Sequence, residues 1–158
     1  MHSVLHIAEK GFRVLPILKR NKIPILDDWT TTASSDFNKI TEWMHRYPDC
    51  NWGLLTGEGF FVLDIDPKNG GLDSWNDLVK QHGEPMTVTC ITGSKGYHLY
   101  FKMPLDFVVA TSSNKVARGI DIRSVGGQVI IPPSTHSNGN VYEWAEGKIG
   151  RASCRERV

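Results

Sequence analysis

The chain has 158 residues, of which 40% are hydrophobic and 22% are charged, and its formal net charge is +1. This composition indicates one globular domain with a buried core and excludes a disordered or collagen-like chain. The chain has no apolar run of the roughly 18 residues that a membrane-spanning helix needs, and no signal-peptide pattern at its N-terminus. Its three cysteines form no CxxC pair, so we expect free thiols and a cytoplasmic location.

The small net charge conceals an uneven distribution. Residues 1–23 contain five Lys or Arg residues against one Glu, and residues 85–158 contain nine basic against five acidic residues. Residues 24–84, between them, are acidic. Basic segments on both sides of an acidic centre are compatible with an anionic partner.

The first third of the chain predicts two helices and one strand. Residues 2–10 carry apolar side chains at helical spacing and precede a glycine that can end a helix. Residues 12–18 form an extended apolar run in which Pro16 favours an edge strand or a bend, and residues 19–35 have the composition of a loop. A second helix is expected after a cap at Ser35 or Asp36, with inward side chains at Phe37, Ile40, Trp43 and Met44.

Extended patterns dominate the rest of the chain, interrupted by one helical pattern over residues 72–82. The predicted strands, in chain order, span residues 52–56, 60–66, 86–91, 97–103, 120–123, 128–131 and 141–144. The first two flank a turn over residues 57–59, the next two pair across residues 92–96, and residues 104–118 are expected to be a loop. Helix–strand units followed by antiparallel strands predict a mixed α+β fold.

Asp64 and Asp66 end an apolar segment that begins at Phe60. Alternate side chains of a strand share a face, so both carboxylates are predicted to project together. Adjacent carboxylates repel each other unless a cation lies between them, and oxygen ligands of this kind suit Mg²⁺ or Mn²⁺. The alternative is an acidic strand end that meets solvent before a turn over residues 67–71.

A third carboxylate occurs in the alternating segment 120–123, where Asp121 and Arg123 share a face. If this strand lies beside the strand of Asp64 and Asp66, the three carboxylates converge and fit a two-metal centre. The alternative for Asp121 is a surface ion pair with a neighbouring arginine.

A glycine-rich turn over residues 92–96 carries groups suited to phosphate. Glycines on both sides of Ser94, Gly96 among them, free the backbone to present N–H groups to an anion. Ser94 adds a hydroxyl, Lys95 a positive charge and His98 a further donor. The turn does not match a P-loop, and the alternative is an ordinary hairpin turn followed by a core histidine.

A pair of prolines ends the predicted strand over residues 128–131. This abrupt stop can place Ser134 and His136 at the rim of a site. The alternative is a turn with polar surface residues.

Together, these elements resemble the primase–polymerase (prim-pol) catalytic domain of the archaeo-eukaryotic primase superfamily, in the form found in plasmid, phage and other mobile-element replication proteins. The shared pattern is an apolar strand ending in Asp-x-Asp, a Ser-x-x-x-His element on a glycine turn, and a later strand with a third acidic residue. The resemblance extends over residues 7–144, and its motif residues are Asp64, Asp66, Ser94, His98 and Asp121.

The resemblance implies a two-lobed α+β domain over residues 1–149, with an antiparallel catalytic sheet related to the RNA-recognition-motif fold. It implies template-directed nucleotidyl transfer, in which a 3′-hydroxyl attacks the α-phosphorus of a bound NTP or dNTP. Two Mg²⁺ or Mn²⁺ ions would be held by the catalytic residues Asp64, Asp66 and Asp121. The expected nucleotide-binding residues are Ser94, Lys95, Gly96, His98, Arg123 and Ser134.

The implied partners are NTP or dNTP substrates and a single-stranded DNA template with its primer. Candidate contacts to DNA phosphates are Lys19, Arg20, Lys22 and Arg118. The resemblance also implies a helicase, in the full-length protein or in trans, and a cytoplasmic, bacterial, archaeal, phage- or plasmid-encoded replication protein. Residues 150–158 have no apolar periodicity, and we expect a disordered or vector-derived tail there.

Two other functions fit parts of the pattern. A metal-dependent phosphohydrolase would use the same Asp-x-Asp element with Asp64 as its nucleophile. This function does not explain why Ser94, His98 and Asp121 occur together with that element. A non-catalytic module would bind single-stranded nucleic acid without metal by stacking bases on Tyr97, Tyr100 or Phe101.

Overall fold

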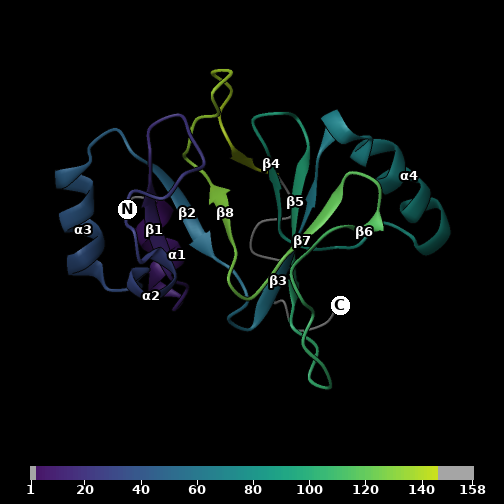
Figure 1. Cartoon of the computed structure of the whole chain (residues 1–158), viewed down its shortest axis with the longest axis horizontal. Helices are drawn as coiled ribbons and strands as arrows, with labels where there is room; N and C mark the ends of the chain where they lie inside the picture. Colours follow the sequence, from purple (N-terminus) through teal and green to yellow (C-terminus); the bar gives the residue numbers. More distant parts are fainter. Residues whose placement is uncertain (1–2, 146–158) are drawn as a thin grey trace.

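The computed structural model describes residues 3–145, which fold into two antiparallel β-sheets and four α-helices (Figure 1). Every pairing between neighbouring strands is antiparallel. The predicted α+β class is therefore confirmed. The tail predicted over residues 150–158 lies outside the described residues.

The smaller sheet has the strand order β1-β2-β8. Its strands are β1 (Val14–Ile17), β2 (Asn51–Leu55) and β8 (Gln128–Ile131). Three helices lie on the same side of the molecule as this sheet (Figure 1): α1 (Ser3–Glu9), α2 (Trp29–Thr32) and α3 (Phe37–Arg46). β1 is an edge strand, as Pro16 predicts, because proline has no N–H to donate to a second neighbour.

The larger sheet has the strand order β6-β7-β3-β5-β4-β9. Its strands are β3 (Phe60–Ile65), β4 (Thr89–Ile91), β5 (Tyr97–Lys102), β6 (Ser112–Ala117), β7 (Ile120–Arg123) and β9 (Glu143–Trp144). Helix α4 (Gly71–His82) follows the short 3₁₀ helix η1 (Pro67–Asn69). Its residues Leu72, Trp75 and Leu78 pack on one face of the sheet.

The side chains of β3 alternate between two hydrophobic clusters. Phe61 and Ile65 belong to the cluster that α4 covers. Phe60 and Val62 belong to the cluster that continues into the smaller sheet. Asp64 is two residues beyond Val62, so it lies on the face turned toward the smaller sheet. The alternation along β3 therefore places a carboxylate between the two sheets.

Two short connections carry the chain between the sheets. Residues 56–59 link β2 to β3, and residues 124–127 link β7 back to β8. The two connections are bonded to each other, because the Thr56 N–H donates to the carbonyl of Gly127 (3.0 Å) and the Thr56 hydroxyl donates to the carbonyl of Ser124 (2.6 Å). The strands that flank the turn over residues 57–59 thus belong to different sheets, which their local pattern does not reveal.

Most of the predicted elements are confirmed. The helix predicted after the cap begins at Phe37, and the Asp36 carboxylate accepts a hydrogen bond from the Lys39 N–H (2.9 Å). The helix over residues 72–82 is α4, and the strand pair across residues 92–96 is β4 and β5.

The structure differs from the predictions in two loops and at one core position. The expected loop 19–35 contains α2, which has four residues and is too short to produce a helical pattern. The expected loop 104–118 contains β6, an exposed edge strand with an irregular register and no alternation of apolar residues. Phe37, predicted to face the core, is 58% exposed because it is the first residue of its helix.

Two glycines of one connection provide a test of the crossing between the sheets. Gly57 and Gly59 both have positive φ angles, but a Cβ atom at position 57 would lie 2.4 Å from the backbone of Val125, whereas one at position 59 meets nothing within 4 Å. We expect Gly59→Ala to lower the free energy of unfolding by about 1 kcal/mol, through backbone conformation alone. Gly57→Ala should lower it by about 3 kcal/mol, because the clash is added. Urea unfolding of both variants measures the difference, and equal losses would contradict the tight contact between the connections.

Candidate active site

The register of three strands aligns polar side chains across the larger sheet. Asp64 of β3 is paired with His98 of β5 on one side and with Asp121 of β7 on the other. Residues directly opposite each other in adjacent strands present their side chains on the same face. The pairing therefore brings two predicted metal ligands and one predicted nucleotide-binding residue into one row.

Asp64 is the centre of this row. Its carboxylate lies 3.5 Å from His98 Nε2 and 3.6 Å from Arg123 Nη2. Its pKa falls from an ordinary value of 3.8 to about 2. Burial by itself raises this pKa, but the positive charges of His98, Arg123 and Lys22 and the hydrogen bond from His98 lower it by more. Asp64 is therefore an anion at neutral pH.

Asp121 is held by its own set of donors. One carboxylate oxygen accepts hydrogen bonds from the Ser113 hydroxyl (2.8 Å) and the Asn114 N–H (3.0 Å), both on the neighbouring strand β6. The other oxygen lies 3.3 Å from Arg123 Nη2. Because Arg123 Nη2 also contacts Asp64, one guanidinium bridges the two carboxylates and offsets their repulsion.

Asp66 has an extended backbone, with φ −98° and ψ 111°, and its carboxylate is hydrogen-bonded within the turn that follows β3. β3 ends at Ile65, and Asp66 is the N-cap of η1. Its carboxylate accepts hydrogen bonds from the Lys68 N–H (3.0 Å) and from the Asn69 side-chain amide (2.5 Å). Across residues 3–145, no group of three or more His, Cys, Asp or Glu side chains is arranged to hold a metal ion.

The glycine turn over residues 92–96 is shaped by close packing. A Cβ atom at Gly96 would lie 2.1 Å from the carbonyl oxygen of Ile65, and one at Gly93 would lie 2.1 Å from the Cβ atom of His136. The N–H groups of Lys95 and Gly96 donate to the carbonyl and hydroxyl oxygens of Thr92, at 2.9 and 3.0 Å. The turn therefore uses both N–H groups internally.

Ser94 and Ser134 are hydrogen-bonded to residues outside the row that Asp64 centres, and neither lines one of the two pockets described below. The Ser94 hydroxyl is 3.2 Å from the Thr92 hydroxyl. Ser134 is buried, and its hydroxyl accepts a hydrogen bond from the Trp52 N–H (2.8 Å) and donates to the Trp52 carbonyl (3.3 Å). The contacts of Ser134 thus join the segment after β8 to β2.

A pocket of about 170 Å³ lies against the row and is called here the inter-sheet pocket. The larger sheet contributes Asp64, His98 and Arg123 to its lining. The smaller sheet contributes Gln128, Val129 and Ile130, and the lining is completed by Lys22 from the loop after β1 and by Tyr142 next to β9. Gln128 and Tyr142 were not predicted to line a site, because an amide and a phenol at strand ends carry no distinctive spacing.

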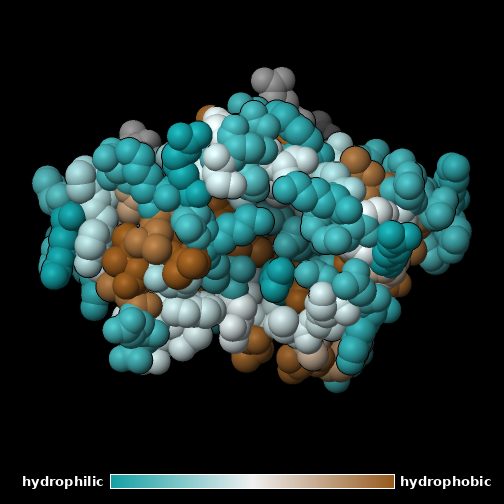
Figure 2. Space-filling view, turned by 45° about the horizontal axis from the view of Figure 1, so that its top comes forward, coloured by the Kyte–Doolittle hydropathy of each residue, from teal (hydrophilic) through white to brown (hydrophobic). Residues whose placement is uncertain are grey.

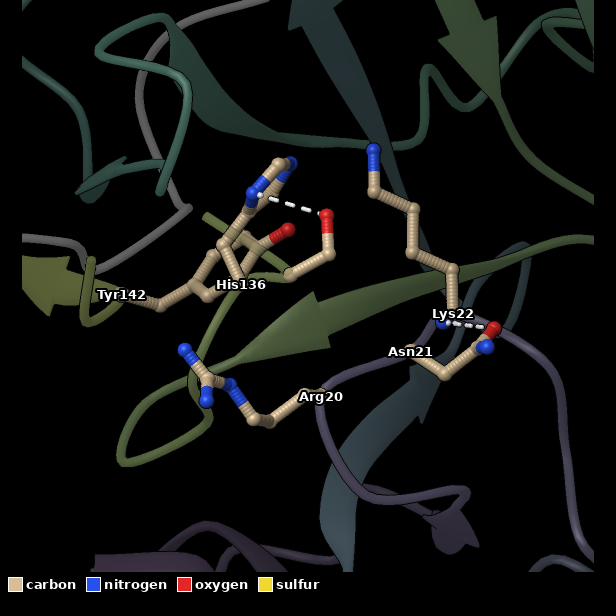
Figure 3. Close-up of a pocket in the computed structure, with 6 residues that line it drawn as sticks. Arg20, Asn21, Lys22, His136 and Tyr142 are labelled. Atoms are coloured by element: carbon tan, nitrogen blue, oxygen red, sulfur yellow. Dashed lines mark hydrogen bonds between the residues drawn. The ribbon is translucent and has the colours of Figure 1, made fainter. Parts of the chain in front are cut away.

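A second pocket, of about 220 Å³, is called here the His136 pocket and is shown in Figure 3. Its lining residues are Arg20, Asn21, Lys22, His136, Ser137 and Tyr142. Lys22 and Tyr142 line both pockets, so the two spaces adjoin. In the space-filling view, hydrophilic residues cover the centre and upper edge of the molecule, and a hydrophobic patch lies to the left (Figure 2).

The remaining predicted residues line neither pocket. Lys95 is in the glycine turn, and Lys19 is ion-paired with Asp49 on the surface (3.6 Å). Arg118 packs beside Gly70, next to the N-terminus of α4. Two of the rings considered for base stacking, Tyr100 and Phe101, are buried in the hydrophobic clusters, so they are not available to bases.

The site thus combines paired carboxylates with basic side chains, beside a pocket between the two sheets of an α+β domain. A family model for Prim-Pol, described as the N-terminal domain of bifunctional DNA primase/polymerases, matches residues 4–156. The chain belongs to this family, and the resemblance found in the sequence is confirmed. Membership implies DNA primase/polymerase activity by nucleotidyl transfer, with nucleotide and DNA substrates, at the level of the family.

The comparison with curated proteins finds no match for the chain. None of the helices within residues 3–145 has the length and apolar character needed to cross a membrane.

The ionisation of Asp64 predicts a specific response to acid. Its lowered pKa means that it stabilises the folded state above its ordinary pKa of 3.8, and that this contribution is lost as the pH falls toward 2. We expect the free energy of unfolding of the wild type to fall more steeply between pH 4 and pH 2 than that of Asp64→Asn. Asp77→Asn, on the exposed side of α4, is the control and should keep the wild-type slope. Chemical unfolding at several pH values measures all three proteins, and identical slopes for wild type and Asp64→Asn would refute the effect.

The buried hydroxyl of Ser134 provides a second prediction. Ser134→Ala removes two hydrogen bonds to Trp52, and we expect it to lower the free energy of unfolding by about 1–2 kcal/mol. Because the hydroxyl contacts β2 and lines neither pocket, the folded variant should bind dATP as the wild type does. Thermal unfolding and isothermal titration calorimetry test the two parts. A loss of dATP affinity without a loss of stability would instead support a direct contact with nucleotide.

Proposed function

We propose that this domain carries out template-directed nucleotidyl transfer, as the catalytic core of a DNA primase/polymerase in a replication protein. The observation that carries the proposal is the row of Asp64, Asp121 and His98 on adjacent strands, with Arg123 beside it and a pocket in front of it. The family assignment sets the reaction class, and this row supplies the groups that such a reaction needs.

The reaction joins a primer to a nucleoside triphosphate. The 3′-hydroxyl oxygen of the primer loses its proton to solvent and bonds to the α-phosphorus, the bond from that phosphorus to the β-phosphate oxygen breaks, and pyrophosphate leaves. Phosphoryl transfer depends mainly on positioning and on neutralising charge. His98 and Arg123 line the pocket as donors to phosphate oxygens. Lys22 adds a positive charge from the opposite wall.

Carboxylate oxygens are the ligands that Mg²⁺ and Mn²⁺ prefer, so the donors of Asp64 and Asp121 fit a divalent cation. Bound ions of this kind neutralise phosphate charge and activate the attacking oxygen. We propose Asp64, Asp66 and Asp121 as the ligands. The hydrogen bonds from Lys68 and Asn69 hold the Asp66 carboxylate in place, and Arg123 lies between the other two carboxylates.

The finer features of the family follow as part of the same proposal. The two sheets correspond to two lobes of a prim-pol domain, and the larger sheet to a catalytic sheet related to the RNA-recognition motif. A single-stranded template and primer would bind outside the pockets, where Lys19 and Arg118 are available as contacts to DNA phosphates. A helicase, in the same protein or in trans, would supply the template strand.

The first experiment is extension of a primer on a single-stranded DNA template with labelled dNTPs or NTPs and Mn²⁺ or Mg²⁺. We expect template-dependent incorporation by the wild type and a loss of at least about 100-fold in Asp64→Asn and in Asp121→Asn, because each removes charge from the reacting centre. Chelation of the divalent ion should abolish incorporation in the wild type.

Asp77→Asn is the matched control, since it neutralises one carboxylate on the exposed side of α4 and should retain full activity. Incorporation that survives Asp64→Asn would reveal a contaminating polymerase. Hydrolysis of small phosphate esters without template-dependent synthesis would favour the phosphohydrolase function over polymerisation.

A further inference from the structure

The hairpin of β6 and β7 is irregular at the point where it passes Asp121. Ser112 is paired with Ile122 and Ala117 with Ile120, so residues 113–116, called here the bulged segment, all stand opposite Asp121. β6 is the exposed edge strand of the larger sheet (Figure 1). Extra residues in one strand re-aim its backbone and side chains, and such bulges are frequent next to active sites. The contacts of the bulged segment therefore indicate what it does for the site.

The first two residues of the bulged segment bind one oxygen of Asp121. The Ser113 hydroxyl (2.8 Å) and the Asn114 N–H (3.0 Å) both donate to Oδ1. Asn114 has a φ of 56°, in the left-handed region that asparagine adopts more readily than most residues. The irregular backbone thus directs two donors at a single carboxylate oxygen.

Asn114 also connects Asp121 to the turn that holds Asp66. Its side-chain oxygen accepts a hydrogen bond from the Gly119 N–H (2.7 Å), and the Gly119 carbonyl accepts one from the Asp66 N–H (2.8 Å). Gly119 is packed closely, since a Cβ atom there would lie 2.3 Å from the Gly71 nitrogen. Hydrogen bonds therefore run without interruption from the Asp121 carboxylate through Asn114 and Gly119 to the backbone of Asp66.

The two oxygens of Asp121 have different surroundings. Oδ1 accepts the two hydrogen bonds from the bulged segment, whereas Oδ2 lies 3.3 Å from Arg123 Nη2. The same nitrogen lies 3.6 Å from the Asp64 carboxylate, so Oδ2 is the oxygen on the side of Asp64. A carboxylate held in this way offers one oxygen to a cation. Mg²⁺ needs near-octahedral geometry with short bonds, whereas the larger Ca²⁺ takes more oxygens and often both oxygens of one carboxylate.

We infer that Ser113 and Asn114 are positioning residues, which hold Oδ1 of Asp121 so that only Oδ2 is offered to a divalent cation, and which thereby favour Mg²⁺ or Mn²⁺ over Ca²⁺. This inference rests on the proposed function, because it takes Asp121 as a metal ligand. It gives a role to two exposed residues that the sequence pattern assigned to a loop. Removal of a hydrogen-bond partner of a metal ligand typically lowers metal affinity by about 10–100-fold.

The test measures metal binding directly. Mn²⁺ alone is titrated into the wild type, Ser113→Ala and Ser113→Thr, and the free ion is quantified by electron paramagnetic resonance. The affinity for Ca²⁺ follows from its competition with Mn²⁺. We expect Ser113→Ala to bind Mn²⁺ about ten-fold more weakly, and to lose less affinity for Ca²⁺, because its carboxylate is freer to turn both oxygens toward an ion. Ser113→Thr keeps the hydroxyl and should recover most of the Mn²⁺ affinity.

Two further variants separate this role from a general loosening of the hairpin. Ser112→Ala removes a hydroxyl one residue earlier that does not donate to Asp121, and it should leave both affinities unchanged. Asn114→Gly allows the left-handed backbone and keeps the N–H, but it loses the bond to Gly119. It should therefore show a smaller loss of Mn²⁺ affinity than Ser113→Ala. Circular dichroism checks that each variant is folded.

The outcomes distinguish this inference from the proposed function. Unchanged Mn²⁺ affinity in Ser113→Ala, or equal losses for Mn²⁺ and Ca²⁺, would overturn the inference, and the proposed function would stand if Asp121→Asn still weakened Mn²⁺ binding. Mn²⁺ binding that is the same in the wild type, Asp64→Asn and Asp121→Asn would overturn the proposed metal ligands as well.

Discussion

The geometry of both pockets depends on the place where the chain crosses twice between its sheets. The Thr56 hydroxyl and N–H bond to the returning connection, and Gly57 approaches the Val125 backbone more closely than any side chain would allow. These contacts hold the two sheets at one end, so that their facing surfaces form the walls of the inter-sheet pocket. The close contact between the two connections thus brings residues of the smaller sheet opposite Asp64.

The two pockets differ in the charged side chains around them. The row on the larger sheet contains two carboxylates, which Arg123 bridges and which His98 flanks. Beyond Lys22, the His136 pocket contains basic groups without acidic partners among residues 3–145. Lys22 lines both pockets, so basic side chains continue from the row of Asp64 to the loop that contains His136.

The glycines of the turn over residues 92–96 have a second physical explanation besides phosphate binding. Glycines beside Ser94 are typical of loops that present N–H groups to phosphate. In this fold, Gly96 packs against the Ile65 carbonyl and Gly93 against His136, and neither position has room for a Cβ atom. The turn consequently packs against the loop that contains His136. The side-chain amides of Asn138 and Asn140, in that loop, donate hydrogen bonds to the Gly93 carbonyl (3.0 and 2.9 Å).

Local sequence determined much of this protein. The alternation along residues 60–65 placed Asp64 on the face opposite α4, the Asp36 cap started α3, and the motif residues identified the family. The motifs named Asp64, His98 and Asp121 as site residues, but the pairing of Asp64 with the other two came from the order of the strands in the sheet.

Only the tertiary structure decided which of the predicted site residues meet. It turned Asp66 into the η1 cap, buried Ser134 against β2, and joined residues 20–22 to His136 across more than a hundred residues of chain. The physical reason is that periodicity along a strand or helix specifies which side is apolar, whereas the neighbour on the polar side depends on sheet order and long-range packing. Contacts such as those of Asn51, which join distant loops, leave no spacing in the sequence from which they could be predicted.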